Sequence, residues 1–235
     1  MTFEQITTGF EGIYEVSEAA RLLLVTMHDP EYSDSAIHYR VRNRHLIRWI
    51  HQGLAHPGLA GVTGRQLLLT FEDLISMRVI AFLRALNYSF AKIRHAEYQL
   101  RDVTGHLRPF ATDDIWAEKE GSKDIFGEMA AALLVATRHG QLAFRQLFQE
   151  RLISVHGLTF DERGIAARWR PRSGILLDPK VQFGRPCISG TRIPTGEIAG
   201  MVGAGDSRAF LAKSYPIPQE QIEEAVAWEM DLASA

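Results

Sequence analysis

The chain has 235 residues, of which 46% are hydrophobic and 23% charged, and its formal net charge is -2. These values are typical of globular proteins and allow one or two domains with a substantial core, so we do not expect a disordered chain. Because no apolar run approaches the ~20 residues of a membrane-spanning helix and no export signal is evident, we expect a cytoplasmic protein without a membrane partner. The single cysteine, Cys187, excludes an internal disulfide and is expected to be a buried core residue.

Charge is distributed unevenly along the chain. No acidic residue occurs from Ser35 to Phe71, and between Arg163 and Arg192 seven basic residues stand against one acid. After Lys213 there is no basic residue, and five acids give this tail a charge of -5. Such segregation is typical of a protein with separate phosphate-facing and protein-facing surfaces, although a charge run is also compatible with an ordinary solvated face.

The N-terminal third predicts short helices around a glycine-rich loop. Apolar residues at helical spacing predict a helix over 15–24, and a basic helix follows from Asn43, its expected N-cap, to Gln52, with Gly53 as a stop. Three glycines between 58 and 64 predict a small hairpin or wing that ends in the apolar stretch 66–69.

Two longer helices are expected next. Thr70 and Asp73 have the spacing of a capping box at the start of an apolar helix that continues to Leu86. Ser89 is the expected cap of a further helix that ends at about Leu100.

This order of elements resembles the winged helix-turn-helix module of MerR-type regulators. The similarity is carried by YEVSEAARLL (14–23), LIRWIHQGL (46–54) and LTFEDLISMRVIAFLRALNYSFAKIR (69–94), and it extends over 14–100. The chain departs from that family by about eighteen residues, 24–41, which separate the first helix from the basic helix. The role of this insertion is left open: it either extends the basic helix or covers a partner.

The resemblance implies a DNA-binding surface, and the residue types agree with it. Arginine neutralises phosphates and binds the guanine edge, and asparagine binds the adenine edge in the major groove. Because one short helix reads few base pairs, we expect a homodimer or a higher oligomer on double-stranded operator DNA. The expected DNA-binding residues are Arg40, Arg42, Asn43, Arg44, His45, Arg48 and Arg65.

The middle and the C-terminal third combine scaffold helices, hairpins and three short helices. Apolar segments at 126–137 and 142–152 are expected to be helical, and a β-hairpin is expected around the turn 161–164. Three helices are predicted over 195–202, 207–213 and 218–232, with Ile222, Val226 and Met230 as the apolar stripe of the last one.

The text FGRPCISGTRIPT (183–195), followed by a helix and YPIPQEQIEEAV (215–226), resembles the trihelical domain of VapB-type antitoxins, once catalogued only as a domain of unknown function. The similarity covers 174–230. It implies the antitoxin of a type II pair, which neutralises a PIN-like ribonuclease toxin and represses its own operon.

The C-terminal third offers further contact candidates. The acidic last helix is better suited to a basic protein partner or to solvent than to DNA. Arg192 is equally compatible with an ion pair to Glu197. The expected secondary phosphate contacts are Arg168, Arg170, Arg185 and Arg192, and the toxin-contacting candidates are Tyr215, Ile217 and Trp228, each of which is also compatible with the core.

Catalysis is not expected, because the chain lacks the spacings of common metal, phosphate-loop and nucleophile motifs, and we expect no cofactor or metal. The alternative to the antitoxin is a MerR-like regulator that responds to a small molecule without a toxin partner. The expected fold is mainly α with small β-hairpins (α+β): a MerR-like winged helix-turn-helix over 1–104, a mixed α/β linking region over 105–172 and a trihelical, helix-turn-helix-like domain over 173–235.

Overall fold

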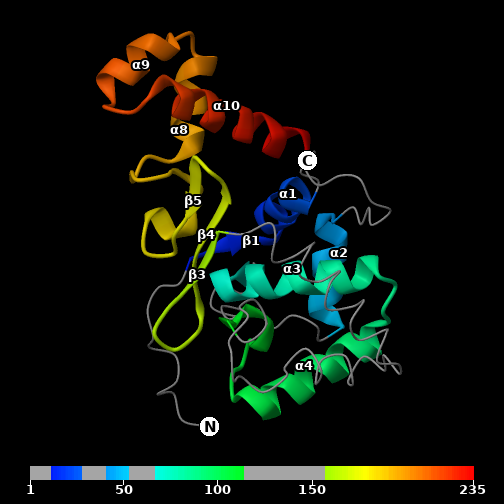
Figure 1. The fold of residues 1–235 in the computed structure, drawn as a ribbon. Coiled ribbons are helices and arrows are strands. Elements are labelled where there is room, and N and C mark those ends of the chain that lie inside the picture. The colour runs from blue at the N-terminus through cyan, green and yellow to red at the C-terminus, as the bar shows by residue number, and fades with distance from the viewer. Residues whose placement is uncertain (1–11, 28–40, 53–66, 114–156) are drawn as a thin grey trace.

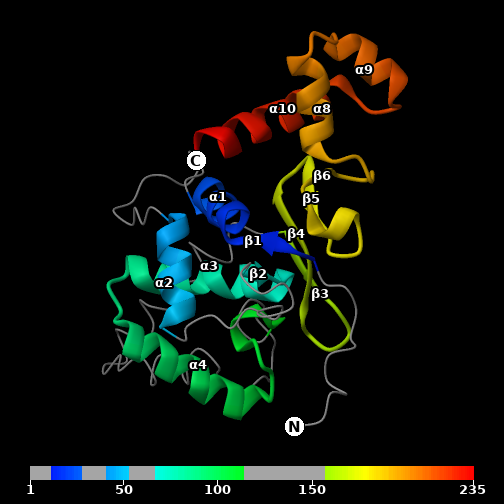
Figure 2. The same cartoon turned by 180° about the vertical axis from the view of Figure 1, so that it is seen from behind.

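An antiparallel sheet joins a helical body to a group of three C-terminal helices (Figures 1 and 2). The structure is a computed structural model that describes residues 12–27, 41–52, 67–113 and 157–235. The body contains α1 (Val16–Met27), α2 (Asn43–His51), α3 (Phe71–Ala85), α4 (Phe90–Thr104) and the 3-10 turn η3 (Pro109–Ala111). The described residues therefore form an α+β fold, as the sequence predicts.

Helix α3 is the central helix of the body. The Thr70 hydroxyl accepts from the Asp73 backbone N–H and the Asp73 carboxylate accepts from the Thr70 N–H, so the predicted capping box is confirmed. Most of the side chains of α3 are buried, which is typical of a helix covered on all sides. Even Arg78 is buried, with its guanidinium 4.8 Å from the Trp169 ring centroid, and burial lowers its pKa to about 9.

The other body helices agree with the sequence apart from their ends. Ser89 caps α4 as predicted by accepting from the Lys92 N–H, and the helix ends at Gly105 in a left-handed conformation, one turn beyond the expected end. Helix α1 is preceded by the two-residue strand β1 (Tyr14–Glu15), which pairs antiparallel with β2 (Leu68–Leu69). The predicted wing over 58–66, with Arg65, and the predicted helices 126–137 and 142–152 lie outside the described residues. Of the insertion 24–41, residues 28–40 lie outside them as well, whereas its beginning belongs to α1, which continues to Met27 beyond the predicted end at 24.

The second sheet has four antiparallel strands in the order β3 (Leu158–Phe160), β4 (Ala166–Arg172), β5 (Ile175–Leu177) and β6 (Cys187–Ile188). The predicted turn before β4 is confirmed: the Asp161 carboxylate accepts from the backbone N–H groups of Arg163 and Ile165, and Gly164 has a φ of 74°. The register with β5 shifts between Trp169 and Arg172, where Pro171 has no N–H to donate.

The three predicted C-terminal helices are present as α8 (Thr195–Gly203), α9 (Arg208–Ser214) and α10 (Gln219–Ser234), and the 3-10 turn η5 (Gln182–Gly184) precedes β6. The buried face of α10 differs from the predicted stripe. It consists of Ile222, Ala225 and Trp228, whereas Met230 is 65% exposed. The prediction for Met230 was wrong because the buried stripe of α10 runs from Ile222 in steps of three residues, whereas the predicted stripe runs in steps of four and turns toward solvent at Met230.

Two hydrophobic clusters hold these elements. The larger one combines Trp49 of α2, Trp169 of β4 and Trp228 of α10, all at most 1% exposed, with α1, α3 and α4. The smaller one, around Ile198, lies among α8, α9 and α10. The views agree that α8 and α9 lie apart from the body, while α10 extends toward α1 (Figures 1 and 2).

A long-range contact joins the start of the described chain to η5. The Tyr14 hydroxyl donates to the Gly184 carbonyl oxygen over 2.9 Å, and the Ile13 N–H donates to the Phe183 carbonyl oxygen over 3.0 Å. Tyr14 is fully buried, and burial raises its pKa well above the usual value. These contacts fix the start of α1 relative to η5.

Candidate nucleic-acid interface

Helix α2 has an apolar inner face and a cationic outer face. Leu46 and Trp49 are buried in the larger core, whereas Arg42, Arg44 and Arg48 are exposed. The two faces follow from the helical period. Leu46 and Trp49 are three positions apart and share one side of the helix, whereas Arg44 is two positions from Leu46 and lies on another side. The predicted basic surface is therefore open to solvent within the described residues.

The beginning of α2 differs from the expectation. Arg42 is the N-cap, in extended conformation, and no side-chain hydrogen bond caps the helix. Asn43 is the first helical residue and is exposed, so the prediction that it caps α2 was wrong, and its use as a base reader stays a prediction. His45 is half-buried, and Arg40 lies outside the described residues.

Two guanidinium groups lie near the aromatic ring of Phe90, at the start of α4. The guanidinium carbon of Arg48 lies 5.3 Å from the centroid of the Phe90 ring, and that of Arg84, from α3, lies 4.3 Å from the same centroid. Arg84 also donates to the Tyr88 carbonyl oxygen, and the Arg94 Nη1 donates to the Gln52 carbonyl oxygen over 2.7 Å. Each of these contacts restricts a flexible cation.

Sequence analysis missed Phe90, Arg84 and Arg94. They belong to α3 and α4, whose apolar spacing indicated only core helices, and no local pattern places them beside α2. The charge of these helices gave no signal either, because their four arginines stand against four acidic residues.

The exposed arginines of α2 and the arginines around Phe90 have no acidic partners within the described residues. Arg101 and Arg108, farther along the body, pair with Glu97 and Asp73 over 2.8 and 2.7 Å. No such ion pair neutralises the exposed cations of α2 or the pair on Phe90. Unneutralised cations on one side of a protein attract polyanions, and they make that binding dependent on salt. We call the set Arg42, Arg44, Arg48, Arg84 and Arg94 the basic surface.

The four secondary phosphate candidates are not equivalent. The Arg168 Nε donates to the buried Asp178 carboxylate over 2.7 Å, so this arginine already has a counter-charge. Arg170, Arg185 and Arg192 are exposed. In the described part of the chain Arg192 forms no ion pair with Glu197, which does not support the structural alternative for this residue.

The predicted toxin contacts lie mostly in the core. Trp228 is 0% exposed and Ile217 is 7% exposed, and Tyr215 is partly buried against the smaller cluster. For Trp228 and Ile217 the core alternative therefore holds, because both pack inside the chain itself. Phe210 of α9, at 57% exposed, and Met230 of α10, at 65%, are large apolar side chains that this segment presents to solvent.

Several carboxylates of the acidic helix α10 already accept hydrogen bonds from other parts of the chain. Glu224 accepts from the Gly174 N–H over 2.9 Å, and Asp231 accepts from the Arg172 guanidinium over 2.6 Å. Glu229 accepts from the Thr195 hydroxyl. Glu220 and Glu223 are exposed, so the charge that α10 offers to a partner is smaller than the sequence suggests.

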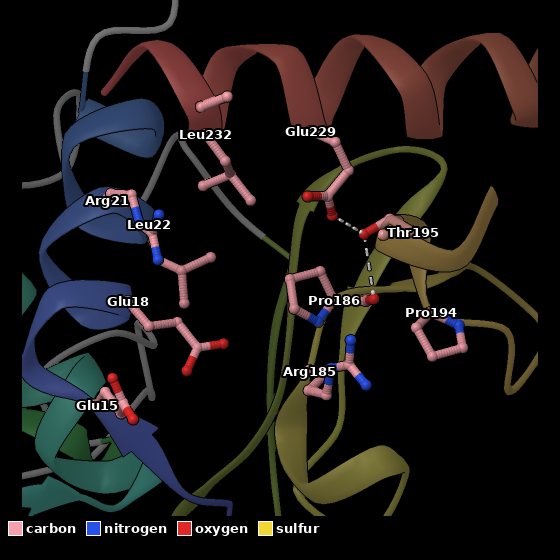
Figure 3. Close-up of a pocket in the computed structure, with 12 residues that line it drawn as sticks. Glu15, Glu18, Arg21, Leu22, Arg185, Pro186, Pro194, Thr195, Glu229 and Leu232 are labelled. Carbon is pink, nitrogen blue, oxygen red and sulfur yellow. Dashed lines mark hydrogen bonds between the residues drawn. The ribbon is translucent and has the colours of Figure 1, made fainter. Parts of the chain in front are cut away.

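A cavity of about 290 Å³ lies between α1 and the C-terminal helices (Figure 3). Glu18 and Leu22 line it from α1, Arg185 and Pro186 from the loop before β6, and Glu229 and Leu232 from α10. No group of three or more His, Cys, Asp or Glu side chains in the described ranges is placed to hold a metal ion. None of the helices described is long and apolar enough to span a membrane.

Known proteins resemble this chain both in part and along most of its length. Residues 175–228, from β5 into α10, match the family described as "Protein of unknown function (DUF433)". A Mycobacterium tuberculosis (strain ATCC 25618 / H37Rv) protein named as a candidate antitoxin, VapB45, is 24% identical over 231 aligned positions, and the match covers 91% of this chain and 92% of the relative. The chain is therefore similar to this candidate antitoxin along most of its length.

The fold has a counterpart among solved structures. The crystal structure of Rv2018 from Mycobacterium tuberculosis superposes with a TM-score of 0.58 at 20% identity, covering 91% of this chain and 96% of that chain. At this identity the likeness shows a shared fold alone. The helical body and the C-terminal helices thus occur together in another protein.

Proposed function

We propose that this chain is the antitoxin of a type II toxin–antitoxin pair, which neutralises a PIN-like ribonuclease toxin and binds operator DNA to repress its own operon. The similarity to a candidate VapB45 antitoxin supports the antitoxin part. The match of residues 175–228 to DUF433 adds to it, since the sequence of this segment resembles the trihelical domain of VapB-type antitoxins. The observation that carries the DNA-binding part is the basic surface.

The DNA-binding part requires several exposed cations on one side of a rigid element. Arg42, Arg44 and Arg48 project from α2, whose inner face is anchored by Trp49. Binding to phosphates would release condensed counterions, and the asparagine at position 43 could read a base edge in the major groove. His45, Arg40 and Arg65 would extend this surface. A winged helix-turn-helix of the MerR type would use it as a dimer on half-sites ~34 Å apart.

The toxin-binding part would use exposed groups of the C-terminal helices. The side chains that remain accessible include Phe210 of α9 and the carboxylates Glu220 and Glu223 of α10. An apolar anchor near charged groups is the usual composition of a protein interface. The buried Trp228 would support this surface from below rather than contact the toxin.

The DNA-binding part is tested by the salt dependence of binding to the upstream region of the operon. We expect the double change Arg44→Ala and Arg48→Ala to make the negative slope of log K against log salt concentration less steep, by roughly 0.9 for each lost phosphate contact. Arg208→Ala, an exposed arginine of α9, is the matched control and should leave the slope unchanged. An unchanged slope in the double variant would remove α2 from the interface.

The antitoxin part is tested by co-expression with the neighbouring reading frame. We expect a stable complex that purifies as one species, with ribonuclease activity that appears when the two chains are separated. A chain that purifies alone and never inhibits the neighbouring product would contradict this role. The cavity beside α1 favours a second candidate, a regulator that responds to a small molecule, which would bind DNA differently when a metabolite is present.

A further inference from the structure

The cavity between α1 and the C-terminal helices has walls from three separate parts of the chain. Residues 15–22 form one wall, the loop 185–186 and the start of α8 at 194–196 form the second, and α10 at 229–233 forms the third. Figure 3 shows Glu18 and Leu22 on one side, facing Pro186 and Arg185, with Glu229 and Leu232 extending from α10. A molecule bound here would touch both the body and the segment that matches DUF433.

The inner charge of the cavity is negative. Glu18 and Glu229 are half-buried, whereas Arg21 and Arg185 are exposed at the rim. Within the described residues no ion pair joins either carboxylate to either arginine. Burial raises the pKa of Glu18, although the backbone N–H of Glu15 and the nearby Arg185 and Arg21 act in the opposite direction. A carboxylate that burial destabilises in this way gains from a cation placed against it.

The remaining walls suit a short hydrocarbon chain. Leu22 and Leu232 face the cavity from two helices, and Pro186 and Pro194 close it from the loops. Small-molecule sites commonly combine apolar walls with a few convergent polar groups, and the volume lies at the small end of their range. The exposed arginines could receive an anionic group at the outer end of the same ligand.

We propose that this cavity binds a small organic cation, an amine or guanidine on a short alkyl stem, whose charged end lies between Glu18 and Glu229. The ligand would bridge α1 to α10, so its binding would stabilise the arrangement of the body and the C-terminal helices. This inference goes beyond the antitoxin role, because ligand binding requires neither toxin nor DNA.

The test is calorimetric titration of the full chain with agmatine, putrescine and L-arginine, with succinate as an anion of comparable size. We expect saturable binding of at least one of the three cations and none of succinate. Glu18→Gln should weaken the binding at least tenfold, since it removes the charge while keeping the shape of the side chain. Glu162→Gln, an exposed carboxylate of the 161–164 turn outside the cavity, is the matched control and should bind as the parent does.

A thermal unfolding curve of each variant separates loss of binding from loss of folding. The proposal is overturned if none of the three cations binds at millimolar concentration, if succinate binds more tightly than they do, or if a folded Glu18→Gln variant binds the cation unchanged. A failure of the antitoxin role would appear in the toxin and DNA experiments instead, which are carried out without any of these ligands.

Discussion

The guanidinium of Arg172 in β4 lies over the indole of Trp228 in α10, 5.2 Å from the ring centroid. Asp231, one turn farther along α10, holds the same guanidinium through a 2.6 Å hydrogen bond. The end of the sheet is thereby joined to the last helix by a stacked and charged contact, while Trp228 itself completes the larger core.

This arrangement predicts that Trp228 governs stability. Trp228→Ala should lower the free energy of unfolding by about 3–5 kcal/mol, because the cavity left behind lies in the core and the Arg172 stack is lost. Met230→Ala, two residues away and exposed, should change it by less than about 0.5 kcal/mol. Urea unfolding followed by circular dichroism measures both. Equal stability of the two variants would show that Trp228 does not occupy the core.

Two glycines offer a test of the hairpin geometry. Gly157 and Gly190 have φ angles of 76° and 80°, so alanine is strained at both. A Cβ at Gly157 would also lie 2.4 Å from the Arg170 carbonyl oxygen, whereas the space around Gly190 is open. We expect Gly190→Ala to cost about 1 kcal/mol and Gly157→Ala at least about 1 kcal/mol more. Chemical denaturation of the pair would contradict the β3–β4 geometry if the two costs were the same.

Phe90 should influence DNA binding without carrying charge. Phe90→Leu removes the ring that orders Arg48 and Arg84, and a loss of about 1 kcal/mol corresponds to roughly fivefold weaker operator binding. Because both cations remain, the salt slope should not change, in contrast to the arginine variants. Phe90→Tyr keeps an aromatic face and should bind as the parent does. Fluorescence anisotropy over a salt series checks this prediction, and it fails if the leucine variant binds with full affinity.

Cys187 makes stability depend on pH above neutrality. Burial raises the pKa of its thiol from 9.0 to about 11, so between these values the folded chain binds more protons than the unfolded chain. Stability from this group is therefore fully present below pH 9 and falls as the pH rises toward 11. From pH 8 to pH 10 we expect a loss of about 1 kcal/mol relative to Cys187→Ala. If the stabilities of the parent and of Cys187→Ala changed with pH in the same way, the pKa of the thiol would not be raised by burial.

The sequence could predict those features that depend on residues close together in the chain. The capping box of Thr70 and Asp73, the Ser89 cap and the Asp161–Gly164 turn depend on residues within four positions of one another, and all three are confirmed. The same logic failed at Asn43, because the residue before it adopts the extended conformation of an N-cap without a side-chain hydrogen bond.

Non-local features could not be predicted in this way. The α2 surface was indicated by its charge, but the grouping of Arg48, Arg84 and Phe90 depends on how α2, α3 and α4 pack. The cavity likewise has Glu18 and Glu229, 211 positions apart in the numbering, among its lining residues. Trp228 was ambiguous for the same reason, because a tryptophan on an amphipathic helix suits both a core and an interface.

The hydrogen bond from Tyr14 to Gly184 spans 170 positions of the chain. At a translation rate of about 5–20 residues per second, the acceptor leaves the ribosome roughly 10 to 30 seconds after the donor. Until then the Tyr14 hydroxyl has no such acceptor, and the first strand has only its pairing with residues 68–69. A nascent chain stalled before Gly184 would therefore leave the Tyr14 end of the body unanchored.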